Sequence, residues 1–286
     1  MKIRLWLLPL AGLLSQCGGS AGMPHGRMTQ VINVSAYDPK ERQREGRSFS
    51  EHDVSALRAN GAAGLIARCG KGGVLDTKCA EFLASADRAG MLAGAYYRLQ
   101  THVDAVVQAD QFVSRMQEIA RGRSWNTSRL LLCGDFDANS KLSDITRFID
   151  RVEARTGVTP VVYLENSEHM RLMLSGADSA TKAKLRRAPY WAALYSHESG
   201  ACKCFPAPGS PAGLTKQYNV WHDWSLWQYG GVDWEHGCSV AKHYSNGSFR
   251  SGTFFGDLNC PVERNVFHGN PDDLAGFWQR HGIAVR

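Results

Sequence analysis

The stretch RLLLCGDFD, residues 129–137, decides the fold because an apolar run ends there in two carboxylates. A near-continuous apolar run is typical of a parallel strand that is covered on both faces. Side chains alternate along a strand, so Asp135 and Asp137 point to the same side. Neighbouring like charges are destabilising unless a substrate, a cation or a metal ion uses them. The pair therefore predicts an acid/base site, a metal site, or a strand that ends in a solvated turn.

Strands and helices alternate on either side of this stretch, five times in all. The strands are predicted at residues 30–37, 64–70, 92–99, 129–137 and 159–166. The helices are predicted at residues 48–61, 76–90, 101–121 and 140–157 and from residue 167 onward. Such alternation gives either a doubly wound sheet or a barrel. After residue 186 short strands follow without intervening helices, and a helix at 270–282, with Pro271 at its first position, closes the chain.

Polar and aromatic side chains gather where the predicted strands end. They are Asn33 and Ser35, Arg68, Tyr96 and Arg98, Asp135 and Asp137, and Tyr163 and Glu165. In a parallel barrel the carboxyl ends of the strands form the active face. Any single aromatic residue in this set is more often a core residue than a ligand, but the whole set favours a binding cleft. Tyrosine, tryptophan and carboxylates together suit a sugar polymer, because aromatic rings stack on the apolar faces of pyranoses.

Residues 1–21 have the pattern of a secretory signal. Lys2 and Arg4 precede an apolar stretch that is too short to span a membrane. Cys17 resembles a lipoprotein cleavage site that would receive a lipid, whereas Ala21 suits ordinary cleavage. We therefore expect export, either to the periplasm, to an outer-membrane anchor or to the medium. A tether at residues 22–29 and one domain at residues 30–286 follow.

Eight cysteines fit an oxidising compartment. Without Cys17 seven remain, so at least one thiol stays free, and Cys133 in the apolar run is the candidate for an inert buried thiol. Cys202 and Cys204 are expected to pair with Cys238 and Cys260. Zinc is the alternative for these four, but the spacing CKC and the lack of a nearby histidine pair at a regular interval disfavour it.

The composition is that of an ordinary globular protein, with 43% hydrophobic and 21% charged residues. The formal net charge is +6 at pH 7. A mildly basic surface suits an anionic polymer such as peptidoglycan, and it is equally common without any function. No run of Lys and Arg supports binding of nucleic acid.

Seven blocks of the chain from Val31 to Trp278 resemble the glycoside hydrolase family 25 lysozymes, the Chalaropsis-type muramidases. The blocks are INVSAY, the region 64–99, DFDAN, TPVVYLEN, YWAALY, WSLWQYGG and VERNVFHGNPDDL. Each block alone is a weak signal, but their order and spacing are specific. The resemblance implies an irregular TIM-like α/β barrel with five strand–helix units followed by three strands, (β/α)5β3. It also implies peptidoglycan glycan strands as the substrate, no cofactor, no metal ion and a monomer.

The chain departs from the family pattern where the chemistry is expected. Asn33 stands where the family has Asp, Asp137 where it has the general acid Glu, and Glu263 where it has Asp. Among these acidic positions only Asp135 is as in the family. Insertions at residues 196–220 and 234–260 are also untypical of the family.

The resemblance implies Asp137 as the general acid and Asp135 as the carboxylate that orients the N-acetyl group, with Glu263 and Asn33 beside them. Close carboxylates raise each other's pKa, which favours retention of one proton. The candidate substrate-binding residues are Tyr37, Arg68, Tyr96, Tyr163, Glu165, Trp191, Tyr195 and Trp227.

Four interpretations remain open at this point. The main one is an exported muramidase that cleaves the glycan backbone with N-acetyl assistance. The second is a protein on the same fold that binds glycan without turnover, which Asn33 favours. The third is hydrolysis of chitin or another acetylamino-sugar polymer. The last is a metal site formed by Asp135, Asp137 and Glu263, because hard cations accept carboxylate oxygens.

Overall fold

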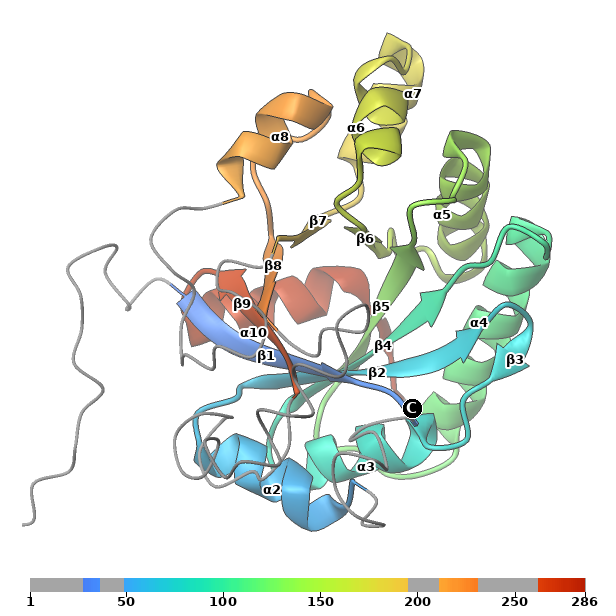
Figure 1. Cartoon of the computed structure of the whole chain (residues 1–286). Coiled ribbons are helices and arrows are strands. Elements are labelled where there is room, and N and C mark those ends of the chain that lie inside the picture. Colours follow the sequence, from blue (N-terminus) through green and yellow to red (C-terminus); the bar gives the residue numbers. More distant parts are fainter. Residues whose placement is uncertain (1–27, 37–48, 195–210, 231–261, 286) are drawn as a thin grey trace, which may run out of the picture.

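Eight strands close into a barrel in the computed structural model, which describes residues 28–36, 49–194, 211–230 and 262–285 (Figure 1). The barrel strands are β1 (Met28–Val34), β2 (Gly64–Lys71), β4 (Leu92–Arg98), β5 (Arg129–Phe136), β6 (Val161–Leu164), β7 (Tyr190–Ala193), β8 (Leu226–Gly230) and β9 (Glu263–His268). Strands β1 to β8 of this set run parallel in the order β1-β2-β4-β5-β6-β7-β8. Strand β9 is antiparallel to both β8 and β1 and closes the barrel.

Helices connect the first strands on the outside of the barrel. They are α2 (Glu51–Ala59), α3 (Cys79–Arg88), α4 (Ala105–Arg121), α5 (Leu142–Thr156), and the pair α6 (Glu168–Ser175) and α7 (Ser179–Arg186). The barrel thus consists of five strand–helix units followed by the three strands β7, β8 and β9. This confirms the predicted (β/α)5β3 barrel and excludes the doubly wound sheet.

Local sequence signals explain where several helices begin and end. Ser50 and Asp53 form the predicted capping box at the start of α2. Helix α5 ends at Gly157, whose φ of 69° lies in the left-handed region that glycine adopts without strain. The helix predicted from residue 167 is divided into α6 and α7, because Asp178 caps a second helix by accepting from the backbone N–H of Thr181.

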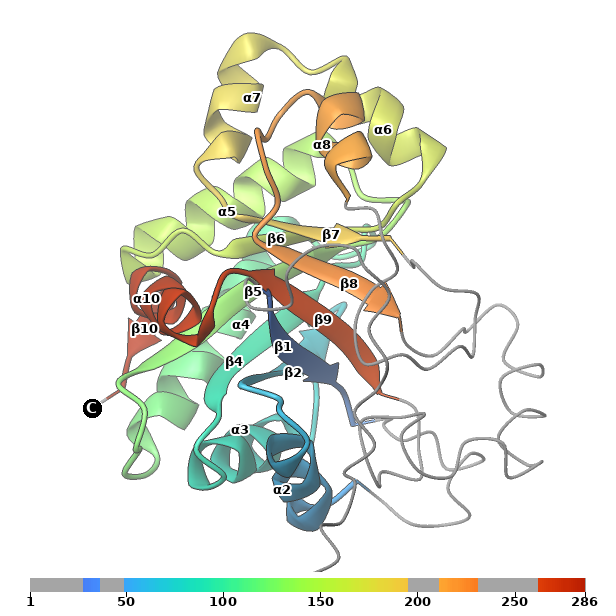
Figure 2. The ribbon, with the colours of Figure 1, turned by 90° about the vertical axis from the view of Figure 1, so that its left-hand side faces the viewer.

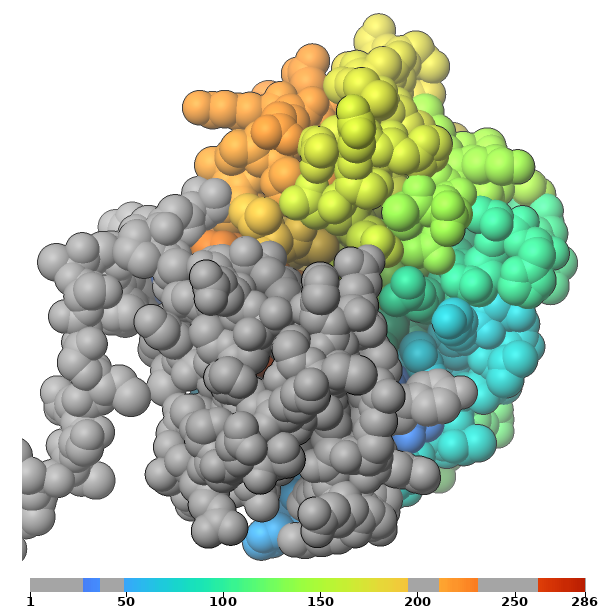
Figure 3. Space-filling view, viewed as in Figure 1, coloured from blue at the N-terminus to red at the C-terminus, as the bar shows by residue number. Residues whose placement is uncertain are grey.

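One prediction about the second half of the chain is wrong. The strands after residue 186 do not follow one another without a helix, since α8 (Ala212–Tyr218) lies between β7 and β8. It falls within the segment 196–220 that the sequence indicates as an insertion. Helices α8 and α6 pack side by side, as the space-filling view shows (Figure 3). Tyr190 of β7 stacks on Trp221 just after α8, with ring centroids 4.7 Å apart.

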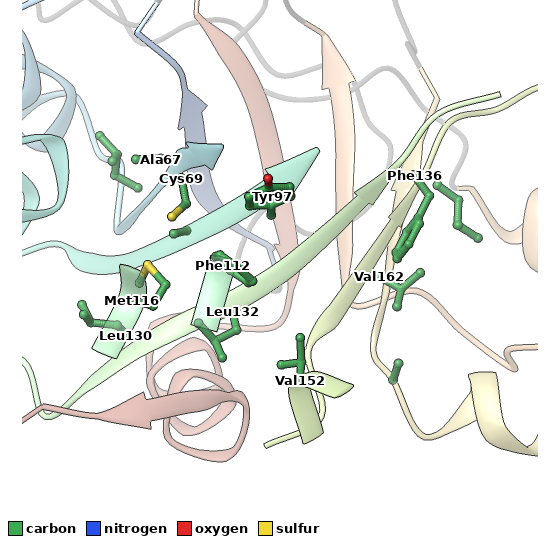
Figure 4. Close-up of a cluster of buried hydrophobic side chains, with 14 of the residues drawn as sticks. Ala67, Cys69, Tyr97, Phe112, Met116, Leu130, Leu132, Phe136, Val152 and Val162 are labelled. Atoms are coloured by element: carbon green, nitrogen blue, oxygen red, sulfur yellow. The ribbon is translucent and has the colours of Figure 1, made fainter. Parts of the chain in front are cut away.

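The alternation of side chains along each strand divides the core into two layers. The outer layer lies between the sheet and the helices and includes Ala67, Cys69 and Tyr97 of the strands beside Phe112 and Met116 of α4 (Figure 4). The inner layer fills the barrel. Its buried residues are Val31, Ile66, Tyr96, Leu131, Cys133, Val161, Trp191, Leu226 and Phe267, together with Leu274, Phe277 and Trp278.

Helix α10 (Pro271–His281) covers the amino-terminal end of the barrel (Figure 2). Trp278 is fully buried in the inner layer, and its indole N–H donates to the carbonyl of Ala93 at 2.8 Å. The short strand β10 (Gly282–Ala284) then pairs antiparallel with β5 at Leu130 and Leu131. Because α10 fills this end, the carboxyl ends of the strands are the open side of the barrel as far as the described residues go.

The strand β3 (Val74–Leu75) forms a hairpin with the end of β2 and lies outside the barrel. In the part of the chain described above, no helix combines the length and apolar character that crossing a membrane requires.

Candidate active site

Inward-facing polar side chains gather at the carboxyl ends of the barrel strands, next to the inner core layer. They come from seven of the eight strands: Asn33, Arg68, Tyr96, Arg98, Asp135, Tyr163, Gln228, Glu263 and Asn265. Their positions follow from alternation, since each lies two residues, or a multiple of two, from an inner-layer residue of its own strand. Asp137 and Glu165 lie just beyond the ends of β5 and β6.

Asp135 is a buried carboxylate at this end of the barrel, with 7% of the residue exposed. Within the described part of the chain, its Oδ1 atom is buried and has no hydrogen-bond partner. Burial raises the pKa of Asp135 to about 6 from the ordinary 3.8, although the nearby Arg98 guanidinium opposes this rise. Asp137 and Glu165 raise the pKa of Asp135 further, as neighbouring negative charges do. Asp135 therefore exchanges its proton near neutral pH.

Arg98 lies between three carboxylates at the end of β4. Its Nη2 atom is 4.0 Å from Oδ2 of Asp137 and 3.9 Å from Oε2 of Glu165. The negative charge of Asp135 is the largest cause that raises the pKa of Arg98. The guanidinium thus allows several carboxylates to share one small region.

Asp137 occupies the first residue after β5 and is held by two donors. The side-chain amide of Gln100 donates to its Oδ2 atom at 3.2 Å, and the backbone N–H of Asn139 donates to its Oδ1 atom at 3.0 Å. The side chain is 15% exposed. Its orientation is fixed from two sides, while part of the carboxylate still faces solvent.

Glu263 and Asn33 form a direct pair across the β1–β9 boundary, where they are register partners. The Nδ2 amide of Asn33 donates to Oε2 of Glu263, and the same oxygen accepts from Nε2 of Gln228 at 3.1 Å. Gln228 in turn accepts from the hydroxyl of Tyr163 at 2.8 Å. Asn265 donates to Oδ1 of Asn33 at 2.8 Å. The amide at position 33 therefore serves as a donor to the single carboxylate of this pair.

Trp191 lies inside the barrel rather than on an open surface. It is almost fully buried, and its indole N–H donates to Oδ1 of Asn265 at 2.9 Å. The ring of Tyr163 packs edge-on against it, with centroids 5.1 Å apart. Of these two aromatic residues, Tyr163 is the one nearer to solvent, since it is only partly buried.

Arg68 is fixed by an ion pair with Asp76, which follows the β2–β3 hairpin. The Nε and Nη2 atoms of Arg68 each lie 3.1 Å from Oδ2 of Asp76. Asp76 also accepts from the backbone N–H groups of Ala36 and Lys78, both within 3.1 Å. This carboxylate therefore ties the ends of β1 and β2 to the start of α3.

Other sequence-predicted residues fall elsewhere. Trp227 belongs to the outer layer, where it is buried and its indole N–H donates to the carbonyl of Leu194 at 2.7 Å. It faces away from the barrel interior because it alternates with the inward residues Leu226 and Gln228, so the structure does not bring it together with the other predicted substrate-binding residues. Cys133 is a buried free thiol inside the barrel, and burial raises its pKa. Tyr37, Tyr195, Cys17, Cys202, Cys204, Cys238 and Cys260 lie outside the described residues.

Sequence reasoning missed Gln100, Gln228, Asn265 and Asp76. Gln228 and Asn265 could have been found by counting, because they alternate with the apolar residues Leu226 and Phe267 of short strands. Gln100 and Asp76 lie in loops, where periodicity gives no signal. Among the described residues, no three His, Cys, Asp or Glu side chains are grouped to hold a metal ion, and Asp135, Asp137 and Glu263 do not form such a group.

The arrangement places two carboxylates of different environment on one side of β5. One is buried, with a pKa near neutral pH, and the other is fixed at the edge of the solvent. Such a pair is suited to proton transfer and to the stabilisation of a positively charged sugar ring.

Comparisons with known proteins agree with this geometry. The profile of the glycosyl hydrolases family 25 matches residues 47–237, about two thirds of the chain. A search among curated proteins returns no match.

Solved structures share the fold at low identity. The bacterial lysozyme of Streptomyces coelicolor is 18% identical with a TM-score of 0.55, over 87% of this chain and 96% of that one. The catalytic domain of endolysin ply40 from the Listeria monocytogenes bacteriophage P40 is 17% identical with a TM-score of 0.55, over 88% and 97%. The spore cortex lytic enzyme SleM of Clostridium perfringens is 18% identical with a TM-score of 0.58, over 88% and 70%. On the family match and the shared barrel, the chain belongs to glycosyl hydrolase family 25.

Proposed function

We propose that this chain is an exported muramidase that cleaves the glycan backbone of peptidoglycan. Membership of glycosyl hydrolase family 25 supports a glycoside hydrolase acting on the cell wall. The observation that carries the proposal is the placement of Asp135 and Asp137 on one side of the end of β5, in the two different environments described above.

In the proposed reaction Asp137 donates a proton to the glycosidic oxygen as the bond breaks. Gln100 and the N–H of Asn139 orient its carboxyl group toward the open side of the barrel. The N-acetyl oxygen of the substrate attacks the anomeric carbon, and Asp135 orients the acetamido N–H for this attack. The unpartnered, buried Oδ1 atom of Asp135 supports this role, since a bound N–H would supply the missing hydrogen bond.

The remaining residues position the sugar. Glu263, held by Asn33 and Gln228, provides a second fixed negative charge on the far side of the barrel opening. Tyr163 offers the partly exposed ring, and Arg68, Tyr96 and Glu165 complete the proposed binding set. Trp191 supports the ring of Tyr163 from inside the barrel.

Four variants and two substrates test the assignment of roles. Asp137→Asn should lower kcat on peptidoglycan about 10²–10⁴-fold, because general acid catalysis contributes that much. On an aryl glycoside whose phenol leaves without protonation the same variant should lose little. Asp135→Asn should lose activity on both substrates, since N-acetyl attack is needed for each. Asp137→Glu should keep or raise activity, and the exposed Asp223→Asn serves as the matched control.

The measurements are the release of reducing ends from peptidoglycan and of phenol from the aryl substrate. Equal losses of Asp137→Asn on the two substrates would remove Asp137 from the acid role. Activity of the wild type on chitin but not on peptidoglycan would show an acetylamino-sugar hydrolase of another specificity.

A second function, glycan binding without turnover, is favoured by the amide at Asn33 and by the short side chain of Asp137. Asp is one methylene shorter than Glu, and misplacement of about 1 Å costs about a hundredfold in rate. A wild-type protein that binds peptidoglycan but shows no turnover between pH 4 and 8 would establish this function instead.

The proposal of export is based on the signal-like pattern of residues 1–21. The mature protein would either be secreted freely or carry a lipid on Cys17. The mass of the mature amino terminus distinguishes the two, because a lipidated Cys17 carries added acyl groups and cleavage after Ala21 leaves none.

A further inference from the structure

Cys69 and Cys79 are two fully buried cysteines that meet in the outer core layer. Cys69 lies near the end of β2, at a point where the register between β2 and β4 shifts by one residue. Cys79 is the first residue of α3, which packs on β2. The neighbouring Cys69 thiol is the largest cause that raises the pKa of the Cys79 thiol, so the two side chains lie close together.

The backbone between the two cysteines forces them together. The hairpin of β2 and β3 pairs Gly70 with Leu75, so the chain reverses directly after Cys69. The backbone N–H of Asp76 then donates to the carbonyl of Cys69 at 2.8 Å. Helix α3 begins three residues later and turns its first side chain back onto β2. The hairpin therefore brings the start of α3, with Cys79, beside the end of β2, with Cys69.

We propose that Cys69 and Cys79 are joined by a disulfide bond in the exported protein. Formation requires a disulfide oxidant of the exporting compartment. One thiolate attacks a sulfur of the oxidant, whose S–S bond breaks, and the second cysteine displaces the mixed disulfide. The two cysteines lose two electrons and two protons, and the oxidant gains them as two thiols. The bond closes a loop that contains nine residues between the cysteines.

The neighbouring Cys69 thiol and, after it, burial raise the pKa of the Cys79 thiol well above its ordinary value. Since the thiolate is the reacting species, exchange is slow once the protein has folded. The bond must therefore form during folding, before the outer layer closes over the two thiols. A protein folded under reducing conditions keeps both thiols and protects them.

The bond has a consequence for the proposed site. The same loop carries Asp76, which holds Arg68 at the open end of the barrel. A covalent link between β2 and α3 limits how far this loop opens and so keeps Arg68 in place. The proposal itself does not depend on turnover, because it concerns covalent structure alone.

Peptide mapping of the full chain, produced by export into an oxidising compartment, tests the proposal directly. The protein is unfolded in the presence of iodoacetamide and digested with trypsin, which cleaves after Arg68, Lys71, Lys78 and Arg88. Cys69 and Cys79 then fall on the separate peptides 69–71 and 79–88. We expect one joined species, lighter than the sum of the two peptides by two hydrogen atoms and split by reductant. The internal control is Cys133, which should appear alkylated on peptide 130–141.

Two further samples make the outcome decisive. In Cys79→Ser the joined species should vanish and Cys69 should carry the alkyl group. Wild-type protein folded in reductant should show both cysteines free, and slow to alkylate until denaturant is added. Separate alkylation of Cys69 and Cys79 in the exported wild type, or a link from either to another cysteine, would overturn the proposal.

Discussion

Burial of the Asp135 carboxyl group lowers the stability of the fold, and the same burial raises the pKa of this group. The carboxylate is enclosed by the barrel, and one oxygen has no partner in the described part of the chain. An unpaired buried polar atom is destabilising, and such atoms are concentrated at functional sites. The Arg98 guanidinium reduces the energetic penalty without removing it, since the pKa of Asp135 remains at about 6.

The raised pKa of Asp135 predicts a specific pH dependence of stability. The unfolded chain ionises this group near pH 4, and the folded chain near pH 6, so the folded state loses stability as the pH rises through this interval. A pKa difference of about 2 corresponds to about 3 kcal/mol. Asp135→Asn does not titrate, so its free energy of unfolding relative to the wild type should rise by up to about 3 kcal/mol from pH 4 to pH 7.

Urea unfolding at several pH values measures this difference. Asp110→Asn is the control, because Arg151 and Arg155 lower the pKa of Asp110, and the stability it contributes is lost only below pH of about 4. The relative stability of this control should not rise over the same interval. Parallel pH curves for Asp135→Asn and the wild type would contradict the prediction.

The pair Asn33–Glu263 predicts a compensating double substitution. Asn33→Asp places a second carboxylate against Glu263 in a buried position, so it should destabilise the fold by about 1–3 kcal/mol at pH 7. Adding Glu263→Gln restores one charge and one amide and should recover most of this loss.

A double-mutant cycle of the free energy of unfolding gives the coupling between positions 33 and 263. Contacting residues of this kind couple by about 0.5–3 kcal/mol. The loss caused by Asn33→Asp alone should shrink at low pH, because protonation of either carboxyl group removes the repulsion between two negative charges. If the effects of the two substitutions on the free energy of unfolding were additive at pH 7, the hydrogen bond between residues 33 and 263 would contribute nothing to stability.

At the scale of elements, helix α10 connects sequence to function by closing the end of the barrel away from the site. Its capping residues Asn270 and Asp273 and the proline at its first turn fix where it begins. Its apolar face, Leu274, Phe277 and Trp278, fills the barrel bottom. Because this end is filled by apolar side chains, the polar side chains of the interior lie at the other end of the barrel.

Trp278→Ala should therefore be among the costliest single substitutions in the chain. It removes a fully buried ring and leaves the carbonyl of Ala93 without its donor, a change that costs about 3–5 kcal/mol. Trp125→Ala is the matched control, since Trp125 is only partly buried and its ring lies 4.8 Å from Arg123. Urea denaturation compares the two variants. Equal losses for both would mean that α10 does not support the barrel.

The elements predicted well are those whose pattern is strong. The five apolar runs with helices between them are sufficient to define the parallel part of the barrel, because a covered parallel strand has few sequence alternatives. Helix α8 was missed because it has only seven residues, and a short helix with a narrow apolar face gives little periodicity. The division of α6 from α7 depends on the cap at Asp178, a local signal inside an otherwise helical stretch.

For the molecule as a whole, the sequence predicts the members of the site better than their roles. Alternation correctly places Asn33, Asp135 and Tyr163 at the open end of the barrel. Counted along β8, alternation also turns Trp227 away from the interior, because Leu226 and Gln228 on either side of it face inward. It does not give the burial that distinguishes Asp135 from its neighbours, because burial depends on contacts between strands far apart in the chain.

The charge of the whole molecule predicts how the protein reaches its substrate. Under the proposed export, cleavage after Ala21 would remove Lys2 and Arg4 and leave 31 Lys and Arg against 27 Asp and Glu, a net charge of +4. Peptidoglycan carries carboxylates, so this charge favours encounter, and salt screens it over about 10 Å at 0.1 M and about 3 Å at 1 M. KM on intact walls should therefore rise with salt while kcat stays constant. An uncharged oligosaccharide of N-acetylated sugars is the control, and its KM should not change, because no long-range attraction guides it. If salt raised KM equally for both substrates, the effect would belong to the site itself and not to the field of the molecule.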